Sequence, residues 1–173
     1  MPVRWIAGNH DKESKLWHDH LFENYPEGNL GSLGIWLGGM HIAGLGGVFK
    51  ERIWYPRTHS AQPLFPNRVA YMRSLPRASR WRSGLPLKMR DTIFPDDVEK
   101  LRALRADVLV THEAPSTHRF GFVEIDRAAE LCRARIVVHG HHHRSVTGLL
   151  PTGVKVRGLA KAEVLRLRLE DLA

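Results

Sequence analysis

The stretches ADVLVTHEAP, residues 106–115, and RIVVHGHHH, residues 135–143, decide the fold expected for this sequence. Each contains a short apolar run that is typical of a buried strand and that ends at side chains able to bind a metal. The first run leads to His112, and the second leads to the three histidines at 141–143. Because sites in open α/β sheets form beyond the carboxyl ends of the strands, we expect these histidines to converge.

A similar pattern occurs near the start of the chain. Val3 to Ala7 has the composition of a short buried strand, and at Gly8 the chain must turn sharply into Asn9-His10-Asp11. Asn and His side chains offer oxygen and nitrogen donors that suit Mn, Fe, Zn or Ni ions. Cys132 is the only cysteine, which excludes an intrachain disulfide and a cysteine-based zinc site.

The remaining pattern predicts a single α/β domain. At 173 residues and 43% hydrophobic composition, the chain is long enough for one domain with a core and too short to indicate two. Alternating apolar residues between 154 and 169 predict antiparallel strands that complete the sheet. The other expected elements are helices at 13–23, 95–106 and about 123–134, and strands at 40–45, 107–111 and 136–138.

A basic, proline-rich segment at about residues 52–94 interrupts this pattern. It holds nine Lys and Arg residues and no acidic residue as far as position 90, whereas the other 17 basic residues nearly balance the 18 acidic ones. Six of the ten prolines fall within the segment or directly after it. We therefore expect an insertion that lies on the surface rather than in the core.

Three interpretations of this basic segment remain open. It is a solvated loop, or a rim that draws anionic phosphate esters toward a metal site, or a surface that binds nucleic acid. For the last of these, Tyr71 and Trp81 lie among the arginines and offer rings on which bases stack.

Three motifs together resemble a known family. Gly8-Asn9-His10-Asp11, then Thr111-His112, then Gly140-His141-His142-His143 resemble, in this order, the last three signature motifs of the calcineurin-like metallophosphoesterases. The resemblance covers nearly the whole chain. It implies a β-sandwich flanked by helices, and the hydrolysis of phosphomonoesters or phosphodiesters at two divalent metal ions.

The resemblance also implies roles for individual residues. His10 would lie beside the scissile phosphate, where it stabilises charge or protonates the leaving oxygen, and Asp11 would orient His10. A water or hydroxide between the two ions would be the nucleophile. The implied metal ligands are Asn9, His112 and His141 for one ion and His143 for the other.

The sequence departs from the family where the first motifs should occur. Family members begin with D-x-H and G-D-x-x-D motifs, and this sequence contains neither. We therefore expect a metallophosphoesterase domain, residues 1–173, that lacks its N-terminal strands. Either Met1 is an internal or misassigned start of a longer gene product, or the chain is a truncated remnant. Since such metals generally need at least three protein ligands, at most one weakly held ion is expected.

Two functions remain open on this basis. One is a metal-dependent phosphoester hydrolase, a phosphatase or phosphodiesterase, that is incomplete as given. The other is a non-catalytic remnant or binding module that holds an anionic partner, such as nucleic acid, on the basic segment.

No apolar run approaches the roughly 20 residues of a membrane-spanning helix, and the N-terminus does not resemble a signal peptide. We expect no membrane partner and a cytoplasmic location, and the oligomeric state is left open.

Overall fold

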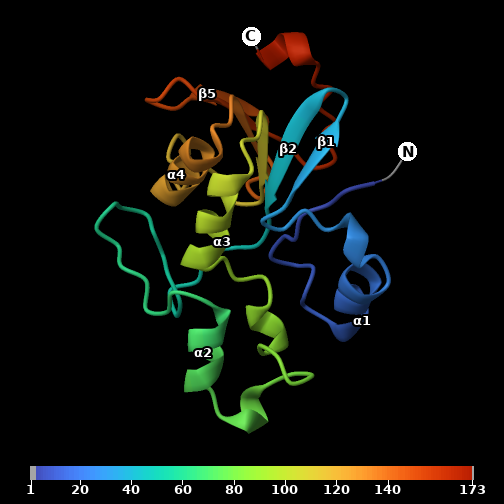
Figure 1. The fold of residues 1–173 in the computed structure, drawn as a ribbon, viewed down its shortest axis with the longest axis vertical. Coiled ribbons are helices and arrows are strands. Elements are labelled where there is room, and N and C mark those ends of the chain that lie inside the picture. Colours follow the sequence, from blue (N-terminus) through green and yellow to red (C-terminus); the bar gives the residue numbers. More distant parts are fainter. Residues whose placement is uncertain (1–2, 173) are drawn as a thin grey trace.

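A mixed six-stranded sheet forms the centre of the structure, a computed structural model that describes residues 3–172 (Figure 1). The strand order is β1-β2-β3-β4-β6-β5, and the two outer strands run antiparallel to the four central ones. The α/β class expected from the sequence is confirmed. The strands are β1 (Gly34–Leu37), β2 (Met40–Leu45), β3 (Val108–Thr111), β4 (Ile136–His139), β5 (Val146–Leu149) and β6 (Lys155–Gly158).

Four short α-helices and several single turns complete the described chain. The α-helices are α1 (Lys15–His18), α2 (Arg68–Ser74), α3 (Pro95–Lys100) and α4 (Val123–Cys132). A π-helical turn, Asp19–Glu23, continues α1. Turns of 3₁₀-helix lie at Pro26–Gly28, Arg77–Ser79, Leu87–Met89, Leu101–Ala103 and Leu169–Leu172. Within residues 3–172, none of these helices has the length and apolar character that crossing a bilayer requires.

The central strands are covered on both faces, which explains their continuous apolar runs. Alternate residues of β3 point to opposite faces, so Leu109 belongs to the cluster that packs on α3 and α4, whereas Val108 belongs to a second cluster. In that second cluster, the irregular C-terminal segment packs Leu165 and Leu167 against the sheet. Strands predicted from buried apolar runs therefore form as expected at β2, β3 and β4.

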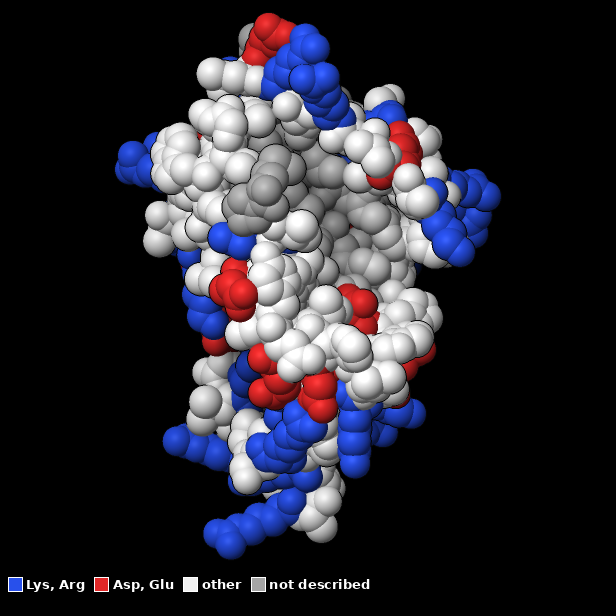
Figure 2. All heavy atoms as spheres, turned by 90° about the vertical axis from the view of Figure 1, so that its right-hand side faces the viewer, with Lys and Arg blue, Asp and Glu red and all other residues white. Residues whose placement is uncertain are grey.

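The basic segment takes part in the core, so the expectation that it lies wholly on the surface is wrong. Ile53, Ile93 and Phe94 are at most 1% exposed, and all three belong to the main core cluster. Apolar residues of the segment share a buried cluster with Val98 of α3, whereas none of the segment's Lys and Arg residues is buried. Figure 2 shows Lys and Arg side chains gathered at the lower end of the molecule, the end where α2 lies in Figure 1.

One expected strand does not form, and the antiparallel strands expected between 154 and 169 form only as far as β6. Residues 3–7 make a single parallel bridge, between Trp5 and Asn29, and Val3 is 65% exposed. In the C-terminal segment the antiparallel pair is β5 with β6, and the chain after β6 contains no strand up to residue 172. Val164 in that segment is 90% exposed. In the segment after β6, the alternation of apolar residues does not reflect a strand. An irregular chain that packs on the sheet also turns alternate side chains, such as Leu165 and Leu167, toward it.

Candidate metal centre

The structure brings Asn9, His112 and His141 together. The Oδ1 atom of Asn9 lies 2.9 Å from Nε2 of His112, and Nδ1 of His141 lies 2.7 Å from the same Nε2 atom. Asn9 comes from the N-terminal loop, whereas the two histidines follow β3 and β4. Three of the four residues expected to bind metal thus converge on one point.

Strand register explains why the two histidines meet. β3 and β4 are parallel, and Thr111 is paired with His139 at their carboxyl ends. The chain therefore leaves both strands at one edge of the sheet, as the sequence pattern predicts. His141 has a positive φ of 66°, which turns the chain back toward β3 within two residues of the strand end.

His10 and His143 lie at the rim of this group. Both side chains are exposed, and His143, like His141, has a positive φ. Burial is the largest cause that lowers the pKa of His141, and the charges of His143 and His10 add to it. The two rim histidines are therefore close enough to act on His141 electrostatically, without a hydrogen bond to it.

Gly8 is required by the close approach of His112. A Cβ atom at position 8 would lie 2.9 Å from Cε1 of the His112 ring, which is closer than real side chains pack. The turn itself is held by Asp11, whose Oδ2 atom accepts a hydrogen bond of 2.6 Å from the Gly8 N–H. This short side chain folds back on its own turn, as Asp commonly does.

The role expected for Asp11 is therefore corrected. We expected Asp11 to orient His10, but the carboxylate beside His10 belongs to Glu13, with Oε1 2.5 Å from Nδ1 of the ring. Both partners are exposed. A Glu three residues after the histidine reaches the ring, because its side chain is not engaged by the Gly8 turn.

The protonation state of the group fits metal binding. Burial, followed by the charges of the neighbouring histidines, lowers the pKa of His112 to about 4. His112 is therefore neutral near pH 7, the state in which an imidazole nitrogen coordinates a metal. Two imidazoles and an amide oxygen around one point form a donor set suited to Mn, Fe, Zn or Ni.

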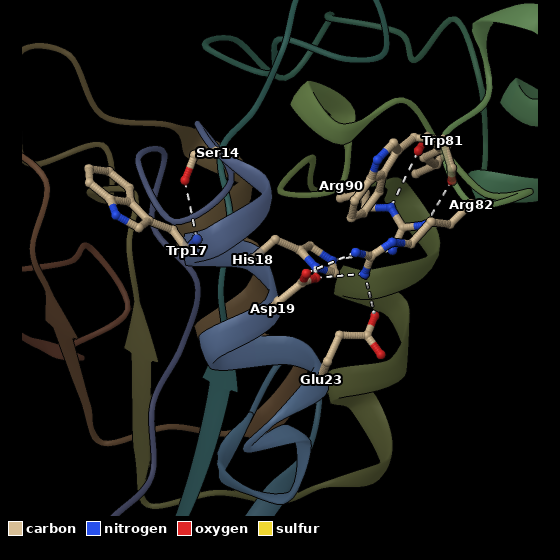
Figure 3. A network of polar contacts seen from close by, with 9 residues as sticks. Ser14, Trp17, His18, Asp19, Glu23, Trp81, Arg82 and Arg90 are labelled. Atoms are coloured by element: carbon tan, nitrogen blue, oxygen red, sulfur yellow. Dashed lines mark hydrogen bonds and ion pairs between the residues drawn. The ribbon is translucent and has the colours of Figure 1, made fainter.

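A second cluster of possible ligands is already occupied by arginine. Within residues 3–172, His18, Asp19 and Glu23 form the one group of three His, Cys, Asp or Glu residues whose ligand atoms lie within 4.8 Å of one another. Figure 3 shows Arg82 between the two carboxylates, at 2.6 and 2.8 Å from Asp19 and 3.4 Å from Glu23. The Arg82 hydrogen bond is the main reason why the pKa of Asp19 falls to about 2. This cluster is an ion-pair network that ties the N-terminal helix to the basic segment.

The two aromatic residues expected to stack on nucleic-acid bases are engaged within the protein. Tyr71 is 6% exposed and packs in the core. The Trp81 ring lies between two guanidinium groups, with Arg82 at 4.3 Å and Arg90 at 4.6 Å from its centroid, and it meets His18 edge-on (Figure 3). Tyr71 is therefore not offered to bases, whereas Trp81 is half-buried and already contacts two guanidinium groups.

Sequence reasoning missed Lys12, which directly follows the motif of residues 8–11. Lys12 is 5% exposed and lies 4.4 Å from the centroid of the Phe22 ring. Burial lowers the pKa of Lys12 to about 7, while Asp91 opposes this effect. It lines a hollow of about 410 Å³ together with Asn9 and Lys50, so positive charge adjoins the candidate centre.

Glu113, which directly follows His112, lines a hollow and also holds a loop. It is 4% exposed and accepts a hydrogen bond from the Phe49 N–H at 3.2 Å. Burial raises the pKa of Glu113 to about 7. It also lines a second hollow that adjoins Asn9 and His141.

Comparison with known proteins gives the same family as these motifs. A family model described as calcineurin-like phosphoesterase matches residues 1–145. The chain belongs to this family of metal-dependent phosphoester hydrolases, and its mixed sheet with flanking helices is consistent with the fold. An uncharacterised protein of Haemophilus influenzae (strain ATCC 51907 / DSM 11121 / KW20 / Rd) is 38% identical over 167 residues, which cover 93% of this chain and 73% of the relative.

Proposed function

We propose that Asn9, His112 and His141 hold a divalent metal ion at a site that hydrolyses phosphomonoesters or phosphodiesters. The observation that carries this proposal is the convergence of an amide oxygen and a second imidazole on Nε2 of His112. When bound, a divalent ion stabilises negative charge on the phosphoryl oxygens and lowers the pKa of a coordinated water. Mn, Fe, Zn and Ni all suit this donor set.

The exposed His10 ring is suited to deliver a proton. In hydrolysis a water oxygen bonds to phosphorus, the ester P–O bond breaks, and the leaving oxygen takes up a proton. His10 lies at the rim of the centre, and Glu13 holds Nδ1 of its ring, which leaves Nε2 for the ester. His10 is thus our candidate general acid, with Glu13 in the positioning role first given to Asp11.

From the ligands in this sequence we expect at most one metal ion to bind, and to bind weakly. His143 would serve a second ion, but the D-x-H and G-D-x-x-D motifs that supply its carboxylate ligands in the family do not occur here. In this proposal residues 1–173 form a single metallophosphoesterase domain, with the basic insertion at about 52–94. A cytoplasmic location likewise remains a prediction.

The alternative function is a non-catalytic module that binds an anionic partner. Its support is the basic end of the molecule in Figure 2, where charge alone would attract a polyanion such as nucleic acid. Binding of this kind weakens steeply with added salt. The burial of Tyr71 removes one of the two stacking rings on which the sequence-based case relied.

Two measurements test the proposed function. Calorimetric titration with Mn²⁺ should show one weak site that is lost in His112→Ala and kept in His59→Ala, an exposed histidine outside the centre. Release of p-nitrophenol from p-nitrophenyl phosphate and its bis-ester should require Mn²⁺ and fall at least about 100-fold in His112→Ala. Manganese binding that is unchanged in His112→Ala would refute the proposed metal site. Turnover that does not require metal would refute metal-dependent hydrolysis.

A further inference from the structure

A hollow of about 530 Å³ adjoins the candidate centre, and its walls are unusually aromatic. Asn9 and His141 line it on the side of the metal donors, while Tyr55, Phe120 and Phe122 line it elsewhere. A volume of this size lies within the range of about 300–1,000 Å³ that small-molecule sites occupy. A phosphate ester bound at the centre would therefore have room beside it for the esterified group.

Two of these rings are exposed at the hollow. Tyr55 is 41% and Phe120 is 47% exposed, whereas Phe122 is only 3% exposed. The Tyr55 ring packs edge-on against Phe122, with centroids 5.1 Å apart, and Phe122 packs on Phe49 at 4.7 Å. The exposed Tyr55 ring is thus supported from behind by core residues and keeps an apolar face open to solvent.

Positive charge borders this wall, since Lys50 and Arg57 also line the hollow. The guanidinium groups of Arg119 and Arg57 lie 4.2 and 5.9 Å from the centroid of the Phe120 ring. His142 also lines the hollow, and its ring stacks on His118 with centroids 3.8 Å apart.

We propose that this hollow binds the planar ring of a mononucleotide, whose phosphate lies at the Asn9 and His141 end. A protein recognises a nucleobase with aromatic rings that stack on the face of the base and with cations beside it. The hollow is larger than a simple aliphatic phosphate would fill. Binding of the ring there does not rely on the charge at the basic end of the molecule. This inference rests on the proposed function, because it names the substrate class of the same site.

The test compares ligands that share a phosphate and differ in the ring. Calorimetry should show AMP binding at least about tenfold more tightly than glycerol 1-phosphate, because stacking contributes only for AMP. Tyr55→Leu and Phe120→Leu should each weaken AMP binding about five- to tenfold and leave glycerol 1-phosphate within twofold. Trp36→Leu removes an aromatic ring that is 70% exposed on β1, outside the hollow, and should change neither ligand.

Adenosine separates this inference from the proposed function, since it carries the ring without a phosphate. Binding of adenosine that Phe120→Leu weakens and His112→Ala preserves would support the ring subsite even if no ester were hydrolysed. Equal affinity for AMP and glycerol 1-phosphate, or AMP affinity unchanged in both leucine variants with native circular dichroism, would overturn it. An oligonucleotide that binds far more tightly than AMP, with steep salt dependence, would also overturn the mononucleotide assignment.

Discussion

The Nε2 atom of His112 lies 2.7 Å from the Nδ1 atom of His141, although 29 positions of sequence separate the two residues. The contact follows from the parallel register of β3 and β4, whose carboxyl ends coincide. Asn9 comes from a third segment, the N-terminal loop. The candidate centre therefore depends on three loop segments that meet at one edge of the sheet.

Substitutions of the two motif glycines should have opposite outcomes. In Gly8→Ala the new methyl group would lie 2.9 Å from the His112 ring and displace it, so the affinity for Mn²⁺ should fall at least about tenfold. In Gly140→Ala the added Cβ meets nothing within 4 Å, so the affinity should stay within about twofold. Calorimetric titration with Mn²⁺ checks both. Similar losses in the two variants would contradict the described packing of His112.

Asp11 and Glu13 should differ in their contribution to stability. Asp11→Ala removes the hydrogen bond that holds the Gly8 N–H and should lower the free energy of unfolding by about 1–2 kcal/mol. Glu13→Ala removes an exposed contact to His10 and should cost less than about 0.5 kcal/mol. Urea denaturation measures both values. A Glu13→Ala cost equal to or above that of Asp11→Ala would contradict the described contacts of the two carboxylates.

Lys12 should make stability depend on pH between about 7 and 10.5. Burial lowers the pKa of Lys12 to about 7, so in this range the folded state holds fewer protons than the unfolded state. The free energy of unfolding of the natural chain should therefore rise with pH through this window. Lys12→Met removes the buried charge and should stabilise the fold by about 2–4 kcal/mol at pH 7, with the difference shrinking toward pH 10.5. Urea denaturation of both chains across this window is the check, and parallel curves would contradict it.

Asp97 should be the more important of the two neighbouring aspartates at the start of α3. Its carboxylate accepts a hydrogen bond from the Phe94 N–H and pairs with Arg68, and it is largely buried. Asp97→Ala should cost about 2–4 kcal/mol, because it removes the helix cap and leaves the guanidinium group of Arg68 without this partner. Asp96→Ala removes an exposed pair with Lys100 and should cost under 1 kcal/mol. Thermal and urea unfolding compare the two, and equal costs would argue against the buried network.

Several elements follow from the sequence because their causes are local. The continuous apolar runs that became β3 and β4 are explained by burial on both faces, and the glycine and ligand-type residues after them mark the carboxyl ends. The periodic apolar face of α4 likewise requires no tertiary information, and its Ile125 and Ala128 are fully buried. The core role of Ile53 and Phe94 was missed, because the prolines and arginines around them are typical of surface chain.

The sequence by itself determined the α/β class and the family. It also determined that Asn9, His112 and His141 follow chain segments able to meet at one sheet edge, because strand burial and turn chemistry are set by neighbouring residues. Only the tertiary structure decided that Asp11 holds the Gly8 turn, that Glu13 contacts His10, and that Tyr71 is buried. The Asp11 and Glu13 contacts each span three residues, and the order of residues does not choose which carboxylate takes which group. The burial of Tyr71 depends on residues distant in sequence, such as Phe94, which only the folded chain brings beside it.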